Sequence, residues 1–178
     1  MNTPQLNQYI ELCKLGNSAA FKNIVSEYQQ LVYSLAFKLM CNEQDAEDVT
    51  QDTFVKVWQN IGNYNQQYKF STWIYKIATH VCYDKLRSKK HLENIDIEDY
   101  DCYSDINQED LLHNKELKKL IIKLTEGLSP KQKLIFTLSD LEELKVEEIK
   151  IVTGLSSGKI KSNLYLARKY IKIKISAL

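Results

Sequence analysis

Apolar residues recur three and four positions apart over most of the chain, which is the spacing of one buried face of an α-helix. The spacing predicts helices over residues 5–15, 18–41, 42–61 and 71–88, and a second helical group from residue 111 onward. The sequence therefore predicts an all-α fold built from two small helical domains.

Capping residues support several of these limits. Ser18 is expected to cap the second helix, and Asn42 is a candidate N-cap for the third. Ser129 and Pro130 combine a capping serine with proline at the first helical position, which is a strong signal for a helix start.

The most distinctive stretch runs from residue 45 to residue 87 and reads as two helices joined by a polar loop. The apolar stripe of its first helix consists of Ala46, Val49, Thr50, Thr53, Phe54, Val57, Trp58 and Ile61. The other face has an acidic N-terminal half and contains Asp48, Gln51, Asp52 and Val55.

The second helix of this stretch has an outer face on which aromatic and basic residues alternate. That face contains Trp73, Lys76, His80, Tyr83 and Arg87. Rings stack on unpaired bases and cations meet the backbone, so the pattern suits a single nucleic-acid strand. The alternative is that Trp73 and Tyr83 are half-buried packing residues with polar edges.

The loop between these helices, residues 62–70, has two tyrosines and no aliphatic side chain. Such a loop between two strongly patterned helices is a functional candidate, because binding residues concentrate on loops held by a rigid scaffold. The alternative is an ordinary surface loop with Tyr64 lying against the helix.

Residues 91–110 contain eight acidic residues and no lysine or arginine. Their apolar positions keep no clear period, so we interpret this segment as an acidic linker. The linker divides the chain into domains at residues 1–90 and 111–178.

The C-terminal part has a helix-turn-helix pattern, with a short helix at 146–153, a glycine turn and a cap at Ser156. The free side of the following helix is basic and polar, with Lys159, Lys161, Ser162, Tyr165, Arg168, Lys169 and Lys172. A helix of this kind lies in the major groove, with base contacts near its start and phosphate contacts later. The alternative is a solvated helix in a helical hairpin.

Composition narrows the function. The chain has 178 residues, is 44% hydrophobic and 26% charged, and carries a net charge of +1. Near-neutrality from separated acidic and basic surfaces suits contact with DNA on one side and a protein on another. No apolar run is long enough for a membrane span and the N-terminus lacks a signal-peptide pattern, so a cytoplasmic protein is expected.

Catalytic and metal-binding patterns are missing from the sequence. The four cysteines are far apart, and His80 and Cys82 point to different sides of one helix. No nucleophile is paired with a base and no loop is suited to hold phosphates. We therefore expect no cofactor, no metal and no enzymatic activity.

The segments DAEDVTQDTFVKVW and FSTWIYKIATHVCYDKLR resemble region 2 of the sigma-70 family, in its extracytoplasmic-function (ECF) group. The resemblance implies a sigma factor that binds core RNA polymerase and directs it to promoters. The residues that would contact the β′ clamp helices of the polymerase are Asp48, Gln51, Asp52 and Val55. The residues that would bind and open the −10 element are Tyr64, Asn65, Lys69, Trp73, Lys76, His80, Tyr83 and Arg87.

The segment LSPKQKLIF and the helix-turn-helix after it resemble sigma region 4, which reads the −35 element and contacts the β flap of the polymerase. The residues that would meet −35 DNA are Lys159, Lys161, Ser162, Asn163, Tyr165, Arg168, Lys169 and Lys172. The family also implies an anti-sigma factor as a partner.

This chain departs from the family pattern at several positions. His80 stands where the family usually has Asn, Asn163 and Leu166 replace common arginines, and Lys145 replaces a capping Ser. Two other functions fit parts of the pattern: a stand-alone helix-turn-helix regulator and a helical protein–protein adaptor. The acidic face of the 42–61 helix, present together with the loop and the second helix, favours the sigma factor.

Overall fold

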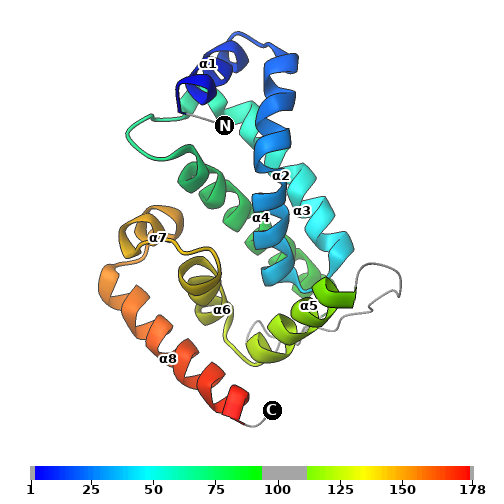
Figure 1. Cartoon of the computed structure of the whole chain (residues 1–178), viewed down its shortest axis with the longest axis vertical. Coiled ribbons are helices and arrows are strands. Elements are labelled where there is room, and N and C mark those ends of the chain that lie inside the picture. The colour runs from blue at the N-terminus through cyan, green and yellow to red at the C-terminus, as the bar shows by residue number, and fades with distance from the viewer. Residues whose placement is uncertain (1–2, 94–111, 177–178) are drawn as a thin grey trace.

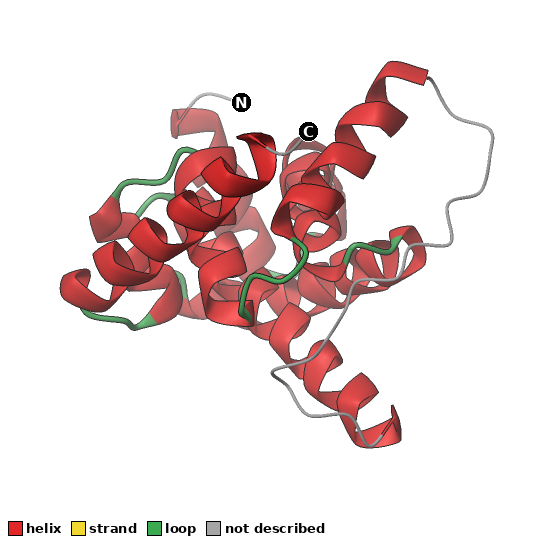
Figure 2. Ribbon diagram, turned by 90° about the horizontal axis from the view of Figure 1, so that it is seen from below, coloured by secondary structure: helices red, strands yellow, loops and turns green. Residues whose placement is uncertain are grey.

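The computed structural model describes residues 3–93 and 112–176, and all of its regular structure in these ranges is helical (Figures 1 and 2). The elements are α1 (Thr3–Lys14), α2 (Ser18–Met40), α3 (Glu43–Asn60), η1 (Ile61–Asn63), α4 (Phe70–Glu93), α5 (Leu112–Thr125), α6 (Pro130–Phe136), η3 (Thr137–Leu141), α7 (Val146–Thr153) and α8 (Ser157–Ser176). The predicted all-α fold is confirmed.

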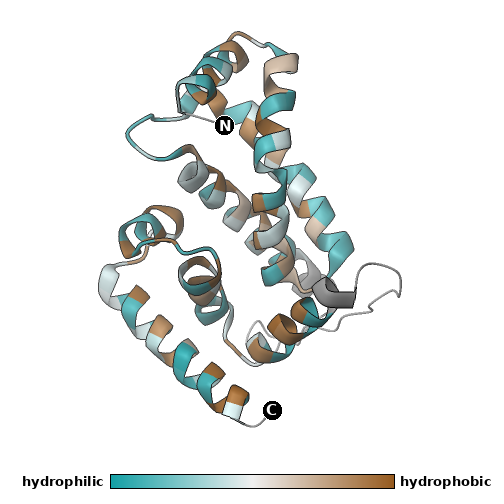
Figure 3. Ribbon diagram, viewed as in Figure 1, coloured by the Kyte–Doolittle hydropathy of each residue, from teal (hydrophilic) through white to brown (hydrophobic). Residues whose placement is uncertain are grey.

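Helices α1 to α4 form the N-terminal bundle, in which α2, α3 and α4 pack against one another. The buried stripe of α3 is the predicted one, except that Thr50 and Trp58 are only half-buried. Val49 and Val57 are fully buried, as are Ile24, Leu35 and Ile74 of the neighbouring helices. Figure 3 shows apolar and polar residues side by side along each helix, as expected for amphipathic helices that bury one side.

The caps of this bundle follow the predictions with one correction. Asn42 Oδ1 accepts a hydrogen bond from the backbone N–H of Asp45, at 2.9 Å, so this N-cap is confirmed. Ser18 is the first residue of α2 and not its cap. Asn17 is the cap, because its backbone is extended and its Oδ1 accepts from Ala20 N–H at 3.0 Å.

Helices α5 to α8 form the C-terminal unit, with α6 packed on α8 and α7 joined to α8 by the predicted turn. Gly154 adopts φ +69° at the end of α7, a conformation that glycine adopts without strain. The expected core of the helix-turn-helix consists of Ile149, Val152, Leu155, Ile160 and Leu164, and all of these are buried except Leu155, which is half-buried.

The start of α7 shows how the chain compensates for Lys145, which has no side-chain acceptor for a cap. Glu148 supplies the other half of a capping box, since it accepts a hydrogen bond from Lys145 N–H at 3.0 Å and so pairs a different backbone donor of this helix start. The other two predicted caps in this unit are confirmed. Ser129 forms a capping box with Gln132, and Ser156 Oγ accepts from Lys159 N–H at 3.4 Å.

The two units lie against each other. Helix α7 packs on α4 (Figure 1). One connected cluster of buried residues runs from the N-terminal bundle into α6, α7 and α8. Helix α4 extends to Glu93, three residues beyond the predicted end of the first domain at residue 90. Most of the predicted acidic linker, together with Cys102, lies outside the described residues.

Buried hydroxyls give a stability prediction. Thr53 is fully buried, and its hydroxyl has no hydrogen-bond partner among the described residues. Thr53→Val should keep or raise the melting temperature, because it removes an unpaired polar group at constant shape. Thr125→Val is the matched control, since Thr125 Oγ1 donates to Ile121 O at 2.7 Å. Loss of this hydrogen bond in Thr125→Val should lower the free energy of unfolding, measured with denaturant, by about 1 kcal/mol. Equal destabilisation by both variants would contradict this.

Candidate nucleic-acid and protein interfaces

The outer face of α3 presents the predicted partner-binding residues to solvent. Gln51 and Asp52 are exposed. Val55 is 54% exposed, although Phe54 and Val57 next to it in the sequence are buried. Asp52 has no ion-pair partner within the described part of the chain. This face therefore offers one unpaired carboxylate and one aliphatic contact point.

Asp48 lies on the same face but is already paired. Its carboxylate accepts from Lys85 Nζ of α4 at 2.5 Å, and Lys85 also lies 3.5 Å from Asp45. Burial by itself would lower the pKa of Lys85, but the hydrogen bond and the charges of the two aspartates outweigh it and raise the pKa. Asp48 thus joins α3 to α4, and Asp52 is the freer charge for a partner.

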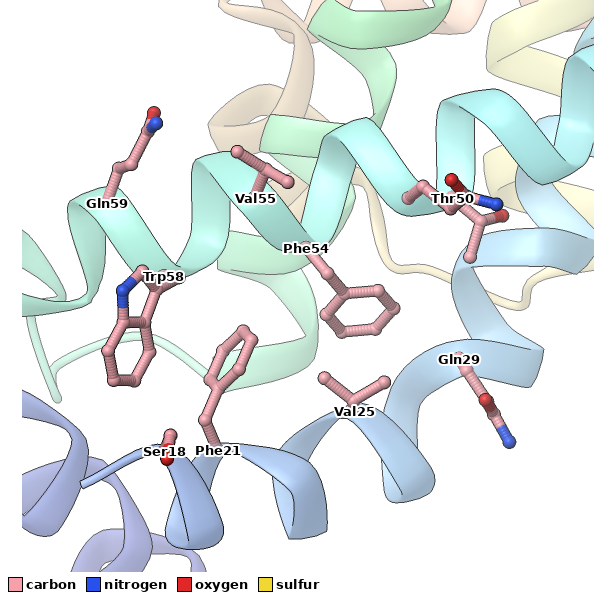
Figure 4. A pocket seen from close by; sticks show the side chains of 10 residues that line it. Ser18, Phe21, Val25, Gln29, Thr50, Phe54, Val55, Trp58 and Gln59 are labelled. Atoms are coloured by element: carbon pink, nitrogen blue, oxygen red, sulfur yellow. The ribbon is translucent and has the colours of Figure 1, made fainter. Parts of the chain in front are cut away.

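An apolar groove of about 580 Å³ runs beside this face, between α2 and α3 (Figure 4). It is lined by Ser18, Phe21, Val25, Gln29, Thr50, Gln51, Phe54, Val55, Trp58 and Gln59. The rings of Phe21 and Trp58 lie 4.9 Å apart. The sequence analysis assigned no function to Phe21 or Val25, which are partly buried here. The signal available in the sequence was an aromatic residue at the edge of each facing stripe, Phe21 on α2 and Trp58 on α3.

In the loop before α4, the structure holds Tyr64 in an aromatic cluster. Its ring lies 4.9 Å from that of Phe70 and 5.4 Å from that of Trp73, and its hydroxyl donates to Tyr68 O at 2.6 Å. Tyr64 is only 9% exposed, and burial raises the pKa of its hydroxyl. Its role in holding a base stays a prediction that requires the ring to move.

Other loop residues are more accessible. Asn65 and Lys69 are exposed, and Asn65 Oδ1 accepts from Gln67 N–H at 2.9 Å. Tyr68 is 46% exposed, so it presents an aromatic ring to solvent where Tyr64 does not. The sequence analysis noted two tyrosines here but assigned only Tyr64. Tyr68 is therefore an additional candidate for stacking.

The outer face of α4 is divided. Lys76, His80 and Arg87 are exposed, and His80 Nδ1 lies 2.7 Å from Lys76 O. Trp73 and Tyr83 are half-buried, as the packing alternative expected. The Tyr83 hydroxyl donates to Pro130 O of the C-terminal unit at 3.3 Å, and burial raises its pKa to about 12.

Helix α8 contains six basic residues and no acidic one: Lys159, Lys161, Arg168, Lys169, Lys172 and Lys174. Lys161, Lys172 and Tyr165 are exposed on one side, and Tyr165 is 67% exposed. Lys159, Ser162 and Lys169 are exposed beside them, whereas Asn163 is half-buried and donates through Nδ2 to Lys159 O at 2.8 Å.

Arg168 differs from these lysines because Asp140 holds it. Its Nη2 and Nε donate to the two carboxylate oxygens of Asp140 at 2.6 and 3.0 Å, a bidentate pair that raises the pKa of Arg168. The guanidinium is thereby fixed in position, and its charge is partly neutralised before any phosphate arrives.

The described residues show no group of three or more His, Cys, Asp or Glu side chains arranged to hold a metal ion. Cys13, Cys41 and Cys82 are buried. Within the described ranges, no helix combines the length and apolarity that crossing a membrane requires.

Comparison with known proteins shows matches over both units. The family model for Sigma-70 region 2 matches residues 24–92, and the model for Sigma-70 region 4 matches residues 118–171. The ECF RNA polymerase sigma factor SigW of Bacillus subtilis is 28% identical, over 97% of this chain and 98% of its own length. SigE of Mycolicibacterium smegmatis is 31% identical, over 88% of this chain and 63% of its own length.

Solved structures share the fold. CnrH in complex with the cytosolic domain of CnrY gives a TM-score of 0.73 at 18% identity, over 97% of this chain and 98% of that one. RpoE of Bartonella quintana, in complex with the anti-sigma factor NepR, gives 0.70 at 21% identity, over 88% and 96%.

An all-helical chain that combines region 2 and region 4 in this order is a transcription initiation factor. The chain belongs to the sigma-70 family of RNA polymerase sigma factors, in the ECF group. It directs transcription initiation, and the match to region 2 decides against a stand-alone helix-turn-helix regulator. Sigma factors bind core RNA polymerase and promoter DNA, which fits the two kinds of surface described above.

Proposed function

We propose that this sigma factor recruits core polymerase through the outer face of α3 and the adjoining groove. The loop before α4 and the outer face of α4 then open the −10 element, while α8 reads the −35 element. The two DNA-binding domains extend over residues 1–90 and 111–178. The protein acts by binding and not as an enzyme, in the cytoplasm, where the polymerase works.

The observation that carries this proposal is the separation of charge between two exposed helical faces. All charged residues of α8 are basic, whereas the exposed positions of α3 carry Glu43, Glu47, Asp48 and Asp52 against a single Lys56. A basic helix attracts the phosphate backbone, and an acidic face repels it and suits a basic protein surface. One chain with a net charge of +1 can thus hold DNA and polymerase at once.

The experiment that tests the proposal is run-off transcription with purified core polymerase over genomic fragments. Promoter-specific transcripts that depend on the added chain would support it, and their absence would reject it. RpoE of Bartonella quintana was solved with an anti-sigma factor. We extend the proposal to an anti-sigma partner for this chain, which co-purification from its own cells would identify.

The α3 face gives a prediction for core binding. Asp52→Lys should weaken affinity for core polymerase about tenfold, or roughly 1.4 kcal/mol, by opposing a basic partner surface. Fluorescence anisotropy of labelled chain titrated with core measures this. Glu11→Lys, the same charge change on α1, should leave affinity unchanged, because it breaks only exposed contacts, with Lys14 and with Gln66. Equal affinities for both variants would reject the assignment.

The α8 face gives a prediction for −35 binding. Lys172→Ala should weaken binding to all sequences and lower the salt slope by about one unit, because one phosphate contact is lost. Arg168→Ala should lower the slope by less, since Asp140 already neutralises part of its charge. Lys161→Ala should instead change sequence preference. Salt titrations on a set of −35 variants test this, and a uniform effect of all three substitutions would contradict it.

His80 gives a prediction for promoter opening. Its ring is exposed, whereas Tyr64 is buried, so a substitution at His80 tests recognition without disturbing packing. His80→Ala should lower the permanganate reactivity of melted thymines while closed-complex binding persists. His80→Asn should retain opening or change its base preference, since an amide offers a donor and an acceptor. Parental reactivity in both variants would show that the strand passes elsewhere.

A further inference from the structure

The imidazole ring of His80 is held by its own helix. The side chain is exposed on the outer face of α4, and its Nδ1 lies 2.7 Å from Lys76 O, one turn earlier. Lys76 O also accepts the backbone N–H of His80, as in any α-helix, and its second lone pair is available for the ring. Because a carbonyl oxygen can only accept, the proton of this second hydrogen bond is on Nδ1.

This hydrogen bond fixes the tautomer of the neutral ring. A neutral imidazole has one N–H group, so the bond that one nitrogen makes decides the state of the other. In the opposite tautomer, the lone pair of Nδ1 would face the lone pairs of Lys76 O at 2.7 Å, and two acceptors at that distance repel each other. Nε2 of the neutral ring is therefore an acceptor and offers no donor to a ligand.

The bases of DNA differ in the hydrogen-bonding groups that such a nitrogen could meet. On the edge that faces the major groove, adenine and cytosine present an exocyclic amine, whereas guanine and thymine present a carbonyl oxygen. An acceptor can bind the amine but repels the oxygen. The ring N–H groups of guanine and thymine are poorer donors to Nε2 than the amines, because a carbonyl oxygen lies beside each of them.

The neighbours of His80 can bring a base within reach of the ring. Lys76 and Arg87 are exposed on the same face of α4, and each can hold a phosphate. Four residues of helix correspond to about 6 Å along the axis, so Lys76 is close to the ring. A nucleotide whose phosphate is bound by Lys76 can therefore place its base against His80.

One other acceptor lies nearby on α4 and has to be distinguished from His80. Asp84, one turn later, has a side chain that is 63% exposed, and a carboxylate also accepts from a base amine. Its Oδ2 lies 3.3 Å from Lys56 Nζ of α3. This ion pair holds the Asp84 carboxylate toward α3, whereas Nε2 of His80 has no such neighbour in the described part of the chain.

We propose that His80 makes this sigma factor select an amino base, adenine or cytosine, over a keto base at one position of its −10 element. The inference rests on the proposed function, because it requires the separated strand to pass along α4. It adds the chemical class of the base and the atom that reads it, Nε2. Loss of this one hydrogen bond should weaken binding of the strand about fivefold.

Nitrogen NMR of the whole chain tests the tautomer without DNA or polymerase. The chain contains three histidines, and comparison with His80→Asn identifies the signals of His80. In mildly alkaline buffer, where imidazole is neutral, Nδ1 of His80 should carry the proton and Nε2 should not. A proton on Nε2 of the neutral ring would overturn the proposal.

Strand binding by the holoenzyme tests the base preference. Fluorescent single-stranded oligonucleotides carry the −10 sequence found by run-off transcription, with each position replaced in turn by the four bases. At one position, adenine and cytosine should bind about fivefold more tightly than guanine and thymine. Replacing adenine there by purine, which lacks the amine, should lose the same factor. A parent without an amino preference at any position would refute the proposal.

Substitutions at His80 connect the preference to the ring. His80→Asn should remove the preference, because an amide offers both a donor and an acceptor. His80→Lys should reverse it in favour of keto bases, because an ammonium group only donates. The comparison uses the ratio of affinities for amino and keto bases, so the added charge of the lysine cancels. A preference that persists unchanged in both variants would exclude His80 as the reading residue.

Two control variants on the same helix separate base reading from other effects. Lys76→Ala should weaken binding of every oligonucleotide and lower the salt slope by about 0.7, with the preference retained, because it removes one phosphate contact to a single strand. Asp84→Asn should leave the preference intact. Its loss in Asp84→Asn alone would assign the reading to the carboxylate instead.

Failure of this inference differs from failure of the proposed function. If promoter-specific transcripts form but His80→Asn keeps the parental preference, only the assignment to His80 is wrong. If the holoenzyme gives no promoter-specific transcript and binds no oligonucleotide, the proposed function and the inference both fail, even where NMR shows the expected tautomer.

Discussion

The burial of one stripe of α3 between α2 and α4 determines where every candidate surface of the N-terminal bundle lies. Because Val49 and Val57 are fully buried, the side chains between them at positions 51, 52 and 55 must point outward. Helix α4 packs against α2 and α3 in the same core, so that Lys76 and His80 lie on its exposed side. One packing constraint thus separates the face that we propose for polymerase from the face that we propose for DNA.

Charge then distinguishes the two proposed binding faces. Lys85 neutralises Asp48 across the contact between α3 and α4, and Asp52 is left as the charge that a partner meets. On α8, Asp140 neutralises Arg168 while the neighbouring lysines stay exposed. In both places an internal pair fixes one charged side chain, and the remaining charges set the field. The bidentate pair with Asp140 holds the Arg168 guanidinium in one orientation. It also weakens the attraction of that charge for a phosphate.

Helix limits, the buried stripes and the helix-turn-helix were predictable, because each depends on residues close together in sequence. Capping serines and periodic apolar residues carry that information locally. The burial of Tyr64 was not predictable in the same way. Its partners Phe70 and Trp73 lie within ten residues, but only the path of the loop brings the three rings together. The hydrogen bonds of Glu142 were even less predictable from local patterns, because the donors Tyr75 and Ser34 lie 67 and 108 residues away in the sequence.

The contact between the two units combines a buried ion pair with an apolar cluster. The attraction between Glu142, which follows η3, and Lys38 of α2 is largely offset by the cost of removing both charges from water. Tyr75 of α4 and the buried residues of α6 and α7 belong to one connected cluster. The apolar part of the contact therefore contributes most of its stability, and the ion pair fixes how the two units are oriented.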